Sequence, residues 1–211
     1  MNLEMKNISK QFGPVAALQD VSFQTGPGEI HGLLGENGAG KTTLMNILSG
    51  NFPPTSGKII IDGKEITDMT PQKSMEMKIR FIHQELNLCN DLKVYENMFL
   101  GEELTNKAGV VDKKTEIKRA QEVLDSMNVQ IDAKALVADL ETAKKQLVEI
   151  AKALLFQSEL IIMDEPTTAL NNQEIENLFS IMRGLQEQKV SLFISPIKCR
   201  RYLPYVTAIR C

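Results

Sequence analysis

The chain has 211 residues, of which 43% are hydrophobic and 24% charged, and its formal net charge is -3. This is the composition of a folded globular chain, so extended disorder is excluded, and the slight acidity leaves no electrostatic footprint for nucleic acid or an anionic membrane surface. Three cysteines and two histidines, widely spaced, do not match the ligand spacing of a zinc site.

The N-terminal part of the chain is predicted to form a small antiparallel sheet. Residues 3–12, 18–24 and 58–66 show partly alternating apolar patterns that are typical of strands. Turn signals punctuate these segments, and they are Gly13-Pro14, Gly26-Pro27-Gly28, Pro53-Pro54 and Asp62-Gly63. We expect this sheet to wrap around the loop that follows residues 30–34.

Residues 35–42 read GENGAGKT, a complete match to the phosphate-binding pattern GxxxxGK[ST]. The apolar run 30–34 before the loop predicts a buried strand, and residues 41–49 after it predict a helix, so the strand–loop–helix context is present. Glycines let the backbone N–H groups point inward, Lys41 reaches the terminal phosphates, and the Thr42 hydroxyl suits Mg²⁺. The candidate nucleotide-binding residues here are Gly35, Glu36, Asn37, Gly38, Ala39, Gly40, Lys41, Thr42 and Thr43. The alternative is a Gly-rich turn before an ordinary helix.

The second half of the chain alternates helical patterns with short apolar runs. From about residue 85 to residue 140 the pattern turns helical, with one apolar face formed by Ile117, Ala120, Leu124 and Met127. Two further helices are predicted around residues 147–154 and 175–185. The runs 160–163 and 190–194 suit buried parallel strands.

An acidic pair follows the first of these strands, where the chain reads LIIMDEP. A carboxylate at the end of a buried strand, beside a phosphate loop, can hold Mg²⁺, and a second acid next to it can polarise a water molecule. Asp164 and Glu165 are therefore candidates for these two roles. The alternative is that the pair only marks a strand leaving the core.

Taken together, these motifs resemble the ATP-binding cassette, the motor domain of ABC transporters, and most of all the first cassette of ribose/galactose-type bacterial sugar importers. The matching stretches are KQFGPVAALQDVSF, GEIHGLLGENGAGKTTLMNILSG, SGKIIIDGKEI, FIHQELNLCNDLKVYENMFLG, VEIAKAL and IIMDEPTTAL. Kinases and small GTPases are not expected to carry a glutamine loop and a helical insert between Lys41 and Asp164.

The resemblance implies an α/β fold: a P-loop NTPase (RecA-like) core with an antiparallel β subdomain and a helical subdomain at about residues 86–155. Residues 1–211 would form a single nucleotide-binding domain that is truncated within its last core strands. Importers of this type fuse two cassettes, so a second half would be missing.

The resemblance also assigns roles to single residues. Phe12 would stack on adenine with Val15 beside it, and the alternative for Phe12 is an ordinary core residue at a strand end. Gln84 would be the glutamine-loop residue that senses Mg²⁺ and the γ-phosphate. Asp164, with Thr42 and Gln84, would serve the Mg²⁺ ion, and Glu165 would be the general base.

The implied cofactors are ATP and Mg²⁺, and the implied partners are a second cassette across ATP and the membrane permease subunits. A periplasmic or extracellular sugar-binding protein would be an indirect partner, and nucleic acid would not be one. The segment 85–100 would face the permease, the alternative being the entry loop of a helical subdomain. No apolar stretch approaches the ~18 residues of a membrane span. We therefore expect a soluble chain with reduced thiols, cytoplasmic and peripheral at the inner face of the membrane.

Four positions depart from the family pattern. The signature LSxGxxQ appears at residues 140–146 with Glu141 in place of serine and Ala143 in place of glycine. Glu141 would bring a carboxylate near a γ-phosphate, or it would simply favour its own helix start by about 0.3–1 kcal/mol. The expected switch histidine is replaced by Pro196, which offers neither a side-chain donor nor a backbone N–H. Asn171 stands where many cassettes have aspartate.

Two functions from different classes fit this sequence. The first is the ATPase subunit or N-terminal cassette of a monosaccharide importer, which couples ATP hydrolysis to transport. The second is a nucleotide-binding but hydrolysis-poor cassette with a regulatory role, or a degenerate one, because the signature serine and switch histidine are missing. A cassette that works on ribosomes or DNA is disfavoured by the charge, although a fold alone does not settle function.

Overall fold

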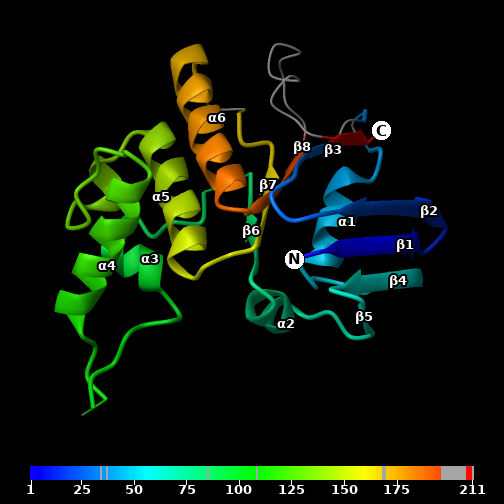
Figure 1. Cartoon of the computed structure of the whole chain (residues 1–211), viewed down its shortest axis with the longest axis horizontal. Coiled ribbons are helices and arrows are strands. Elements are labelled where there is room, and N and C mark those ends of the chain that lie inside the picture. Colours follow the sequence, from blue (N-terminus) through cyan, green and yellow to red (C-terminus); the bar gives the residue numbers. More distant parts are fainter. Residues whose placement is uncertain are drawn as a thin grey trace. The chain divides into compact units, whose positions relative to one another are not determined.

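The computed structural model describes residues 1–33, 35–36, 38–84, 86–107, 109–167 and 170–195, together with the backbone of residues 208–210 (Figure 1). The chain divides into two units. The first unit comprises Met1–Gln84, Ser158–Thr168 and Met182–Cys211, and the second comprises Glu85–Gln157 and Ala169–Ile181.

The first unit contains the predicted antiparallel sheet. Its strands are β1 (Leu3–Phe12), β2 (Val15–Thr25), β4 (Ser56–Ile61) and β5 (Lys64–Ile66), in the order β2-β1-β4-β5. Residues 58–66, which the sequence pattern joins in one segment, fold into the β4–β5 hairpin around Asp62-Gly63. Both residues of this turn have positive φ, which suits a tight two-residue connection.

A parallel sheet forms the rest of the core of this unit. Its strands are β3 (Ile30–Leu33), β6 (Ile79–Ile82), β7 (Leu160–Asp164), β8 (Ser191–Ser195) and β9 (Ala208–Arg210). They lie in the order β6-β7-β8-β3-β9, and every neighbouring pair is parallel. The predicted α/β class with an antiparallel sheet is therefore confirmed.

One hydrophobic cluster joins the two sheets through helix α1 (Lys41–Leu48). Apolar residues of α1 and side chains from both sheets are buried together there, and they include Met5, Phe23, Leu44, Met45, Ile47, Leu48, Ile162 and Phe193. Burial on this scale fixes the start of α1 relative to the ends of β3 and β7. A short helix, α2 (Pro71–Glu76), begins with the Thr70 side chain accepting a hydrogen bond from Lys73 N.

The second unit is helical. It contains α3 (Val94–Phe99), α4 (Lys113–Ser126), the short 3-10 turn η1 (Val137–Asp139), α5 (Thr142–Leu155) and the first part of α6 (Asn172–Glu187). Helices α3, α4 and α5 pack against one another. Ala120 and Leu124 are fully buried on the predicted face of α4.

The predicted helical pattern over residues 85–140 is right for α3 and α4 and wrong for most of the other described residues, most clearly for residues 100–107 and 109–112. Here the chain turns back on itself, with an antiparallel bridge between Thr105 and Val111 and a hydrogen bond from Asn106 N to Val110 O. Gly101 and Gly109 have φ values of 85° and 76°, a left-handed conformation that interrupts a helix.

Within the described part of the chain, none of the helices has both the length and the apolar character that a membrane span requires.

Candidate nucleotide site

The predicted phosphate loop connects the end of β3 to the start of α1. Gly40 is the N-cap residue of α1, with φ 86° and ψ 5°. A Cβ atom on Gly40 would lie 2.6 Å from Ala17 O and 2.6 Å from Leu18 Cδ2, so sterics as well as backbone conformation require glycine here. No side chain caps α1, which leaves its first N–H groups to meet an anion.

Lys41 lies over this loop. Its Nζ donates hydrogen bonds to Gly35 O and Glu36 O, both at 2.8 Å. Two neutral carbonyls hold an ammonium group less strongly than phosphate oxygens do, because the phosphate oxygens carry negative charge that attracts the ammonium directly. The lysine is therefore placed at the loop and ready to exchange partners. Asn37, which was predicted with the loop, lies outside the described residues.

Asp164 ends β7 beside the loop, and both of its carboxylate oxygens accept hydroxyl groups. Thr42 Oγ1 donates to Asp164 Oδ2 at 3.2 Å, and Ser195 Oγ donates to Asp164 Oδ1. Two of the three residues predicted for Mg²⁺ binding, Thr42 and Asp164, are therefore in contact. A hydroxyl and a carboxylate beside a phosphate loop form the hard-oxygen donor set that Mg²⁺ prefers.

Ser195 is a residue of this site that the sequence analysis did not single out. It is completely buried at the end of β8, and it lies directly opposite Asp164 in the parallel β7–β8 pair. The available signal was its position at the end of the predicted strand 190–194. Linking it to Asp164 required the register of two strands that are far apart in sequence.

Glu165 follows Asp164 in a strained backbone conformation. Its φ is 47°, which non-glycine residues seldom adopt, and its N–H donates to Ser195 O at 2.7 Å. Strain of this kind costs about 1–3 kcal/mol and is concentrated at functional sites. The observation agrees with a reactive role for the half-buried Glu165 carboxylate.

Gln84 and His83 follow β6. Gln84 is exposed, and in the described structure it forms no hydrogen bond with Thr42 or Asp164. His83 packs edge-on against Phe81, with ring centroids 4.2 Å apart. Burial lowers the pKa of His83, and the negative charge of Asp164 opposes that shift. His83, which the sequence analysis passed over, therefore lies within the electrostatic reach of the acidic site.

Phe12 is the last residue of β1, beside the turn of the β1–β2 hairpin. It is 46% exposed and packs edge-on against Phe52, with centroids 5.3 Å apart. The Lys10 ammonium lies 5.1 Å and 4.9 Å from the two ring centroids. Val15, opposite Phe12 in the hairpin, is 61% exposed. An aromatic ring this accessible offers a face on which a base can stack, which a buried core ring would not.

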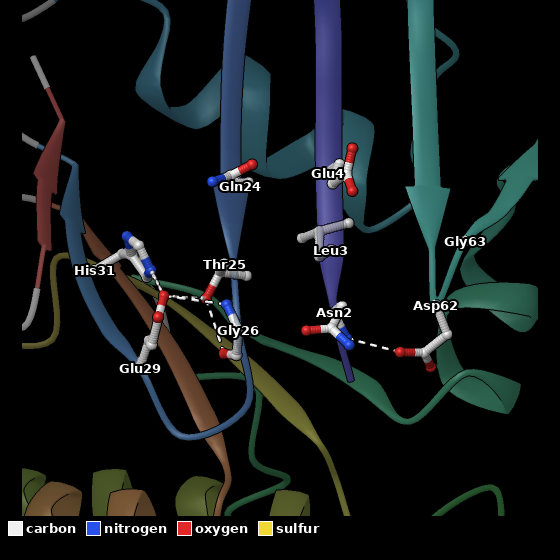
Figure 2. A pocket seen from close by; sticks show the side chains of 10 residues that line it. All are labelled: Asn2, Leu3, Glu4, Gln24, Thr25, Gly26, Glu29, His31, Asp62 and Gly63. Carbon is white, nitrogen blue, oxygen red and sulfur yellow. Dashed lines mark hydrogen bonds and ion pairs between the residues drawn. The ribbon is translucent and has the colours of Figure 1, made fainter.

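A cavity of about 630 Å³ lies at the other end of β3 (Figure 2). Its lining residues are Asn2, Leu3, Glu4, Gln24, Thr25, Gly26, Glu29, His31, Asp62 and Gly63. Glu29 accepts hydrogen bonds from Gly26 N at 3.0 Å, Thr25 Oγ1 at 3.3 Å and His31 Nε2 at 2.7 Å. These bonds, that from Gly26 first, lower the pKa of Glu29. Parallel sheets bind ligands beyond the carboxyl ends of their strands, so this cavity at an amino end is not the nucleotide site.

The departures from the signature pattern fall at the start of α5. Glu141 is its N-cap residue, exposed and without a side-chain capping hydrogen bond.

Asn171, another departure from the family pattern, has a structural explanation. Asn171 Oδ1 accepts from Glu174 N at 3.0 Å, and Glu174 Oε2 accepts from Asn171 N at 2.7 Å. Asparagine closes this reciprocal pair as well as aspartate would. Pro196 lies outside the described residues.

The protein-family comparison matches residues 18–168 to the family model described as ABC transporter. The curated relatives include a ribose import ATP-binding protein of Lactococcus lactis subsp. cremoris (strain SK11), 47% identical over 192 residues. A ribose import ATP-binding protein of Streptococcus agalactiae serotype V is 44% identical over 192 residues. In both cases the match covers 91% of this chain and 39% of the relative. The chain thus spans well under half the length of these proteins.

Solved structures of cassettes share the fold. An ATP-binding cassette of an ABC transporter in its ADP conformation superposes with a TM-score of 0.86 at 25% identity, over 98% of this chain and 85% of that one. A dimeric cassette in a post-hydrolysis state, bound to ADP and Pi, superposes with a TM-score of 0.81 at 25% identity, over 98% of this chain and 92% of the other.

Proposed function

This chain belongs to the ABC transporter family of ATP-binding cassettes, and from that premise we propose that it is the motor of a carbohydrate importer of the ribose type. In this role it binds Mg-ATP, pairs with a second cassette and couples ATP hydrolysis to movement of a membrane permease. The observation that carries the proposal is the contact of Thr42 with Asp164 beside an intact phosphate loop, in a chain whose relatives are named for ribose import.

The residues of the site divide the work of phosphoryl transfer. The N–H groups at the start of α1 bind the phosphates, and Lys41 exchanges its two carbonyl partners for phosphate oxygens. Thr42 and Asp164 hold Mg²⁺, which neutralises charge that develops on the phosphates. Glu165 accepts the proton of the attacking water. Phe12 stacks on the adenine ring.

The part of residues 85–100 that is free to meet a permease is narrower than the sequence analysis expected. Helix α3 is buried within its own unit, since Val94, Met98 and Phe99 are at most 1% exposed. Residues 86–93, in contrast, present several exposed side chains, which are Asn87, Cys89, Asn90, Asp91 and Lys93. We therefore assign permease docking to residues 86–93, here called the docking loop. Through it the chain would be held at the cytoplasmic face of the membrane.

A purified-protein experiment separates this function from its rival. The importer motor turns ATP over with Mg²⁺, and Glu165→Gln suppresses that turnover while nucleotide binding persists. Turnover that Glu165→Gln leaves unchanged would come from a contaminant and would count against the assigned base. Binding without any turnover, even when a second cassette and permease are supplied, would point instead to the hydrolysis-poor cassette.

Crosslinking tests the transport role. Cys89 is exposed in the docking loop, so a variant with Cys199→Ser and Cys211→Ser keeps it as a single native thiol. In membranes that contain the expressed permease, a bifunctional thiol reagent is expected to link Cys89 to that permease. Recovery of soluble partners only would refute the assignment of the docking loop.

A further inference from the structure

The docking loop is closed on itself by one buried side chain. Asn97 is 1% exposed, and its Oδ1 accepts from Cys89 N at 2.7 Å. Its Nδ2 donates to Cys89 O at 3.0 Å and to Lys93 O at 3.1 Å. A single amide thus satisfies three backbone groups, and the loop has one defined shape rather than many.

The loop is also paired with the segment that leads into α5. Val137 N donates to Leu92 O and Ala138 N donates to Asn90 O, both at 3.0 Å, and Lys93 and Leu136 form an antiparallel bridge. Residue 140, which begins the signature segment, follows η1 directly. The docking loop and the signature segment are therefore joined through a backbone ladder.

Helix α5 adds two side-chain contacts of its own. Lys145 Nζ donates to Asn90 Oδ1 at 2.9 Å, and the Glu149 carboxylate accepts a hydrogen bond from the backbone of Asn87. Residues 145 and 149 are four positions apart, so they lie on one face of the helix. Lys145 is itself part of the signature segment, at a position where the family pattern allows any residue.

Burial makes the Glu149 contact consequential. Desolvation raises the pKa of Glu149, while Lys152 and the Asn87 N–H oppose the shift. Removal of the Glu149 acceptor leaves a backbone N–H without its partner, which costs more than the loss of an exposed ion pair. Lys144, the neighbouring lysine, is exposed and makes no contact with the docking loop in the described structure.

We propose that Lys145 and Glu149 are positioning residues that fasten the docking loop to α5, so that the signature segment and the permease contact move as one body. The proposal rests on the proposed function, in which the start of α5 meets the nucleotide held by the partner cassette and the loop meets the permease. When the two cassettes close on the nucleotide, the start of α5 shifts. That shift then reaches the permease through rigid contacts within the helical unit, and the docking loop keeps its conformation.

Hydrogen exchange on the purified chain tests the fastening without any permease. Glu149→Leu is expected to speed exchange of the Asn87 amide about tenfold, because the bond from that amide to a carboxylate is lost. Lys145→Met is expected to speed exchange across residues 87–93 about threefold, because the bond that it removes is exposed. Glu149→Gln retains an acceptor oxygen and is expected to keep the Asn87 amide protected. Lys144→Met is the matched control that leaves the loop unchanged.

The reading is overturned if the Lys145→Met, Glu149→Leu double variant exchanges across residues 87–93 within twofold of the unaltered chain. Lys145 is partly exposed, so Lys145→Met alone keeps the test valid should the Glu149→Leu chain fail to fold.

A second measurement uses the single-thiol chain in membranes with its permease. In the unaltered chain, Mg-ATP is expected to change the yield of the Cys89 crosslink. In the Lys145→Met, Glu149→Leu double variant, the crosslink is expected to form with a yield that no longer responds to Mg-ATP. A retained response would overturn the mechanical link. If the unaltered chain gives no crosslink, the proposed function is overturned instead. The hydrogen-exchange result alone would then decide whether Lys145 and Glu149 fasten the docking loop to α5.

Discussion

Ser195→Ala removes one of the two hydroxyl groups that hold Asp164, and it should damage the nucleotide site and the fold together. The Ser195 hydroxyl is fully buried and donates to a charged carboxylate. Loss of such a bond costs about 1.5–3 kcal/mol. For a chain of this size each kcal/mol lowers the melting temperature by about 2–4 °C, so the expected drop is about 3–12 °C.

Ser191→Ala is a matched control in the same strand. Ser191 is also buried, accepts from Gly28 N at 3.0 Å and donates to Gly26 O at 2.9 Å, but it lies at the opposite end of β8 from Asp164. Both variants should therefore lose stability. Only Ser195→Ala should weaken the Mg²⁺-dependent part of ATP binding, because only Ser195 orients a residue assigned to the metal.

The assay is isothermal titration of ATP with Mg²⁺ and with excess chelator, combined with thermal unfolding. Ser195→Ala is expected to lower affinity severalfold when Mg²⁺ is present and to leave affinity without Mg²⁺ unchanged. Equal loss in both conditions, or a similar loss of Mg²⁺ dependence in Ser191→Ala, would refute the assignment of Ser195 as the residue that orients Asp164.

Three further predictions use simpler readouts. Mg-ATP at one hundred times its Kd should stabilise the chain by about 2.7 kcal/mol in a thermal-shift assay, and Lys41→Ala should abolish most of that shift; a full shift in Lys41→Ala would contradict the role of the loop. Burial raises the pKa of Glu149 in the folded chain above its usual 4.5. The protonated Glu149 carboxyl therefore stabilises the fold fully below pH 4.5, and this stabilisation is lost as pH rises through the folded-state pKa. Glu149→Gln should remove this loss, so its unfolding free energy should gain on that of the unaltered chain between acid and neutral pH. A difference between the two chains that stays constant over this pH range would contradict the raised pKa of Glu149. Glu141→Ser combined with Pro196→His should raise ATP turnover, since one preorganised donor is worth about 10²–10³ in rate; unchanged turnover, with Glu165→Gln as the blank, would show that these departures do not limit the motor.

The parts of the structure with local signals could be predicted from the sequence. The phosphate loop and α1 follow from glycines at required positions and an apolar helical face, and β7 follows from a short continuous apolar run. Strand β6 was missed because it has only four residues, and its sequence, IRFI, places a charged residue inside the run. Residues 100–112 were assigned to a helical pattern although Gly101 and Gly109 marked the interruption.

Contacts between side chains on different strands could not be predicted from the sequence, for a different reason. Ser195 meets Asp164 only because β7 and β8 pair in one particular register, and His83 comes within reach of the Asp164 charge only through β6–β7 pairing. A periodic pattern identifies a strand but not its neighbour or its register, since a shift of one residue exchanges its two faces. The closure of the docking loop by Asn97 depends similarly on how residues 89–97 pack.

The strand order has a consequence for biosynthesis. Strand β3 leads straight into the phosphate loop, yet both of its neighbours come from much later in the chain, β8 at Ser191–Ser195 and β9 at Ala208–Arg210. A ribosome that has synthesised residues 1–190 has thus released the entire GENGAGKT segment without either strand that hydrogen-bonds to β3. Pairings over such separations form late, because the entropy of closing the intervening chain is lost before the contacts repay it. The ability to bind nucleotide is thus acquired only after β8 and β9 have been synthesised, and until then the nascent chain carries an apolar strand with two open edges for chaperones to cover.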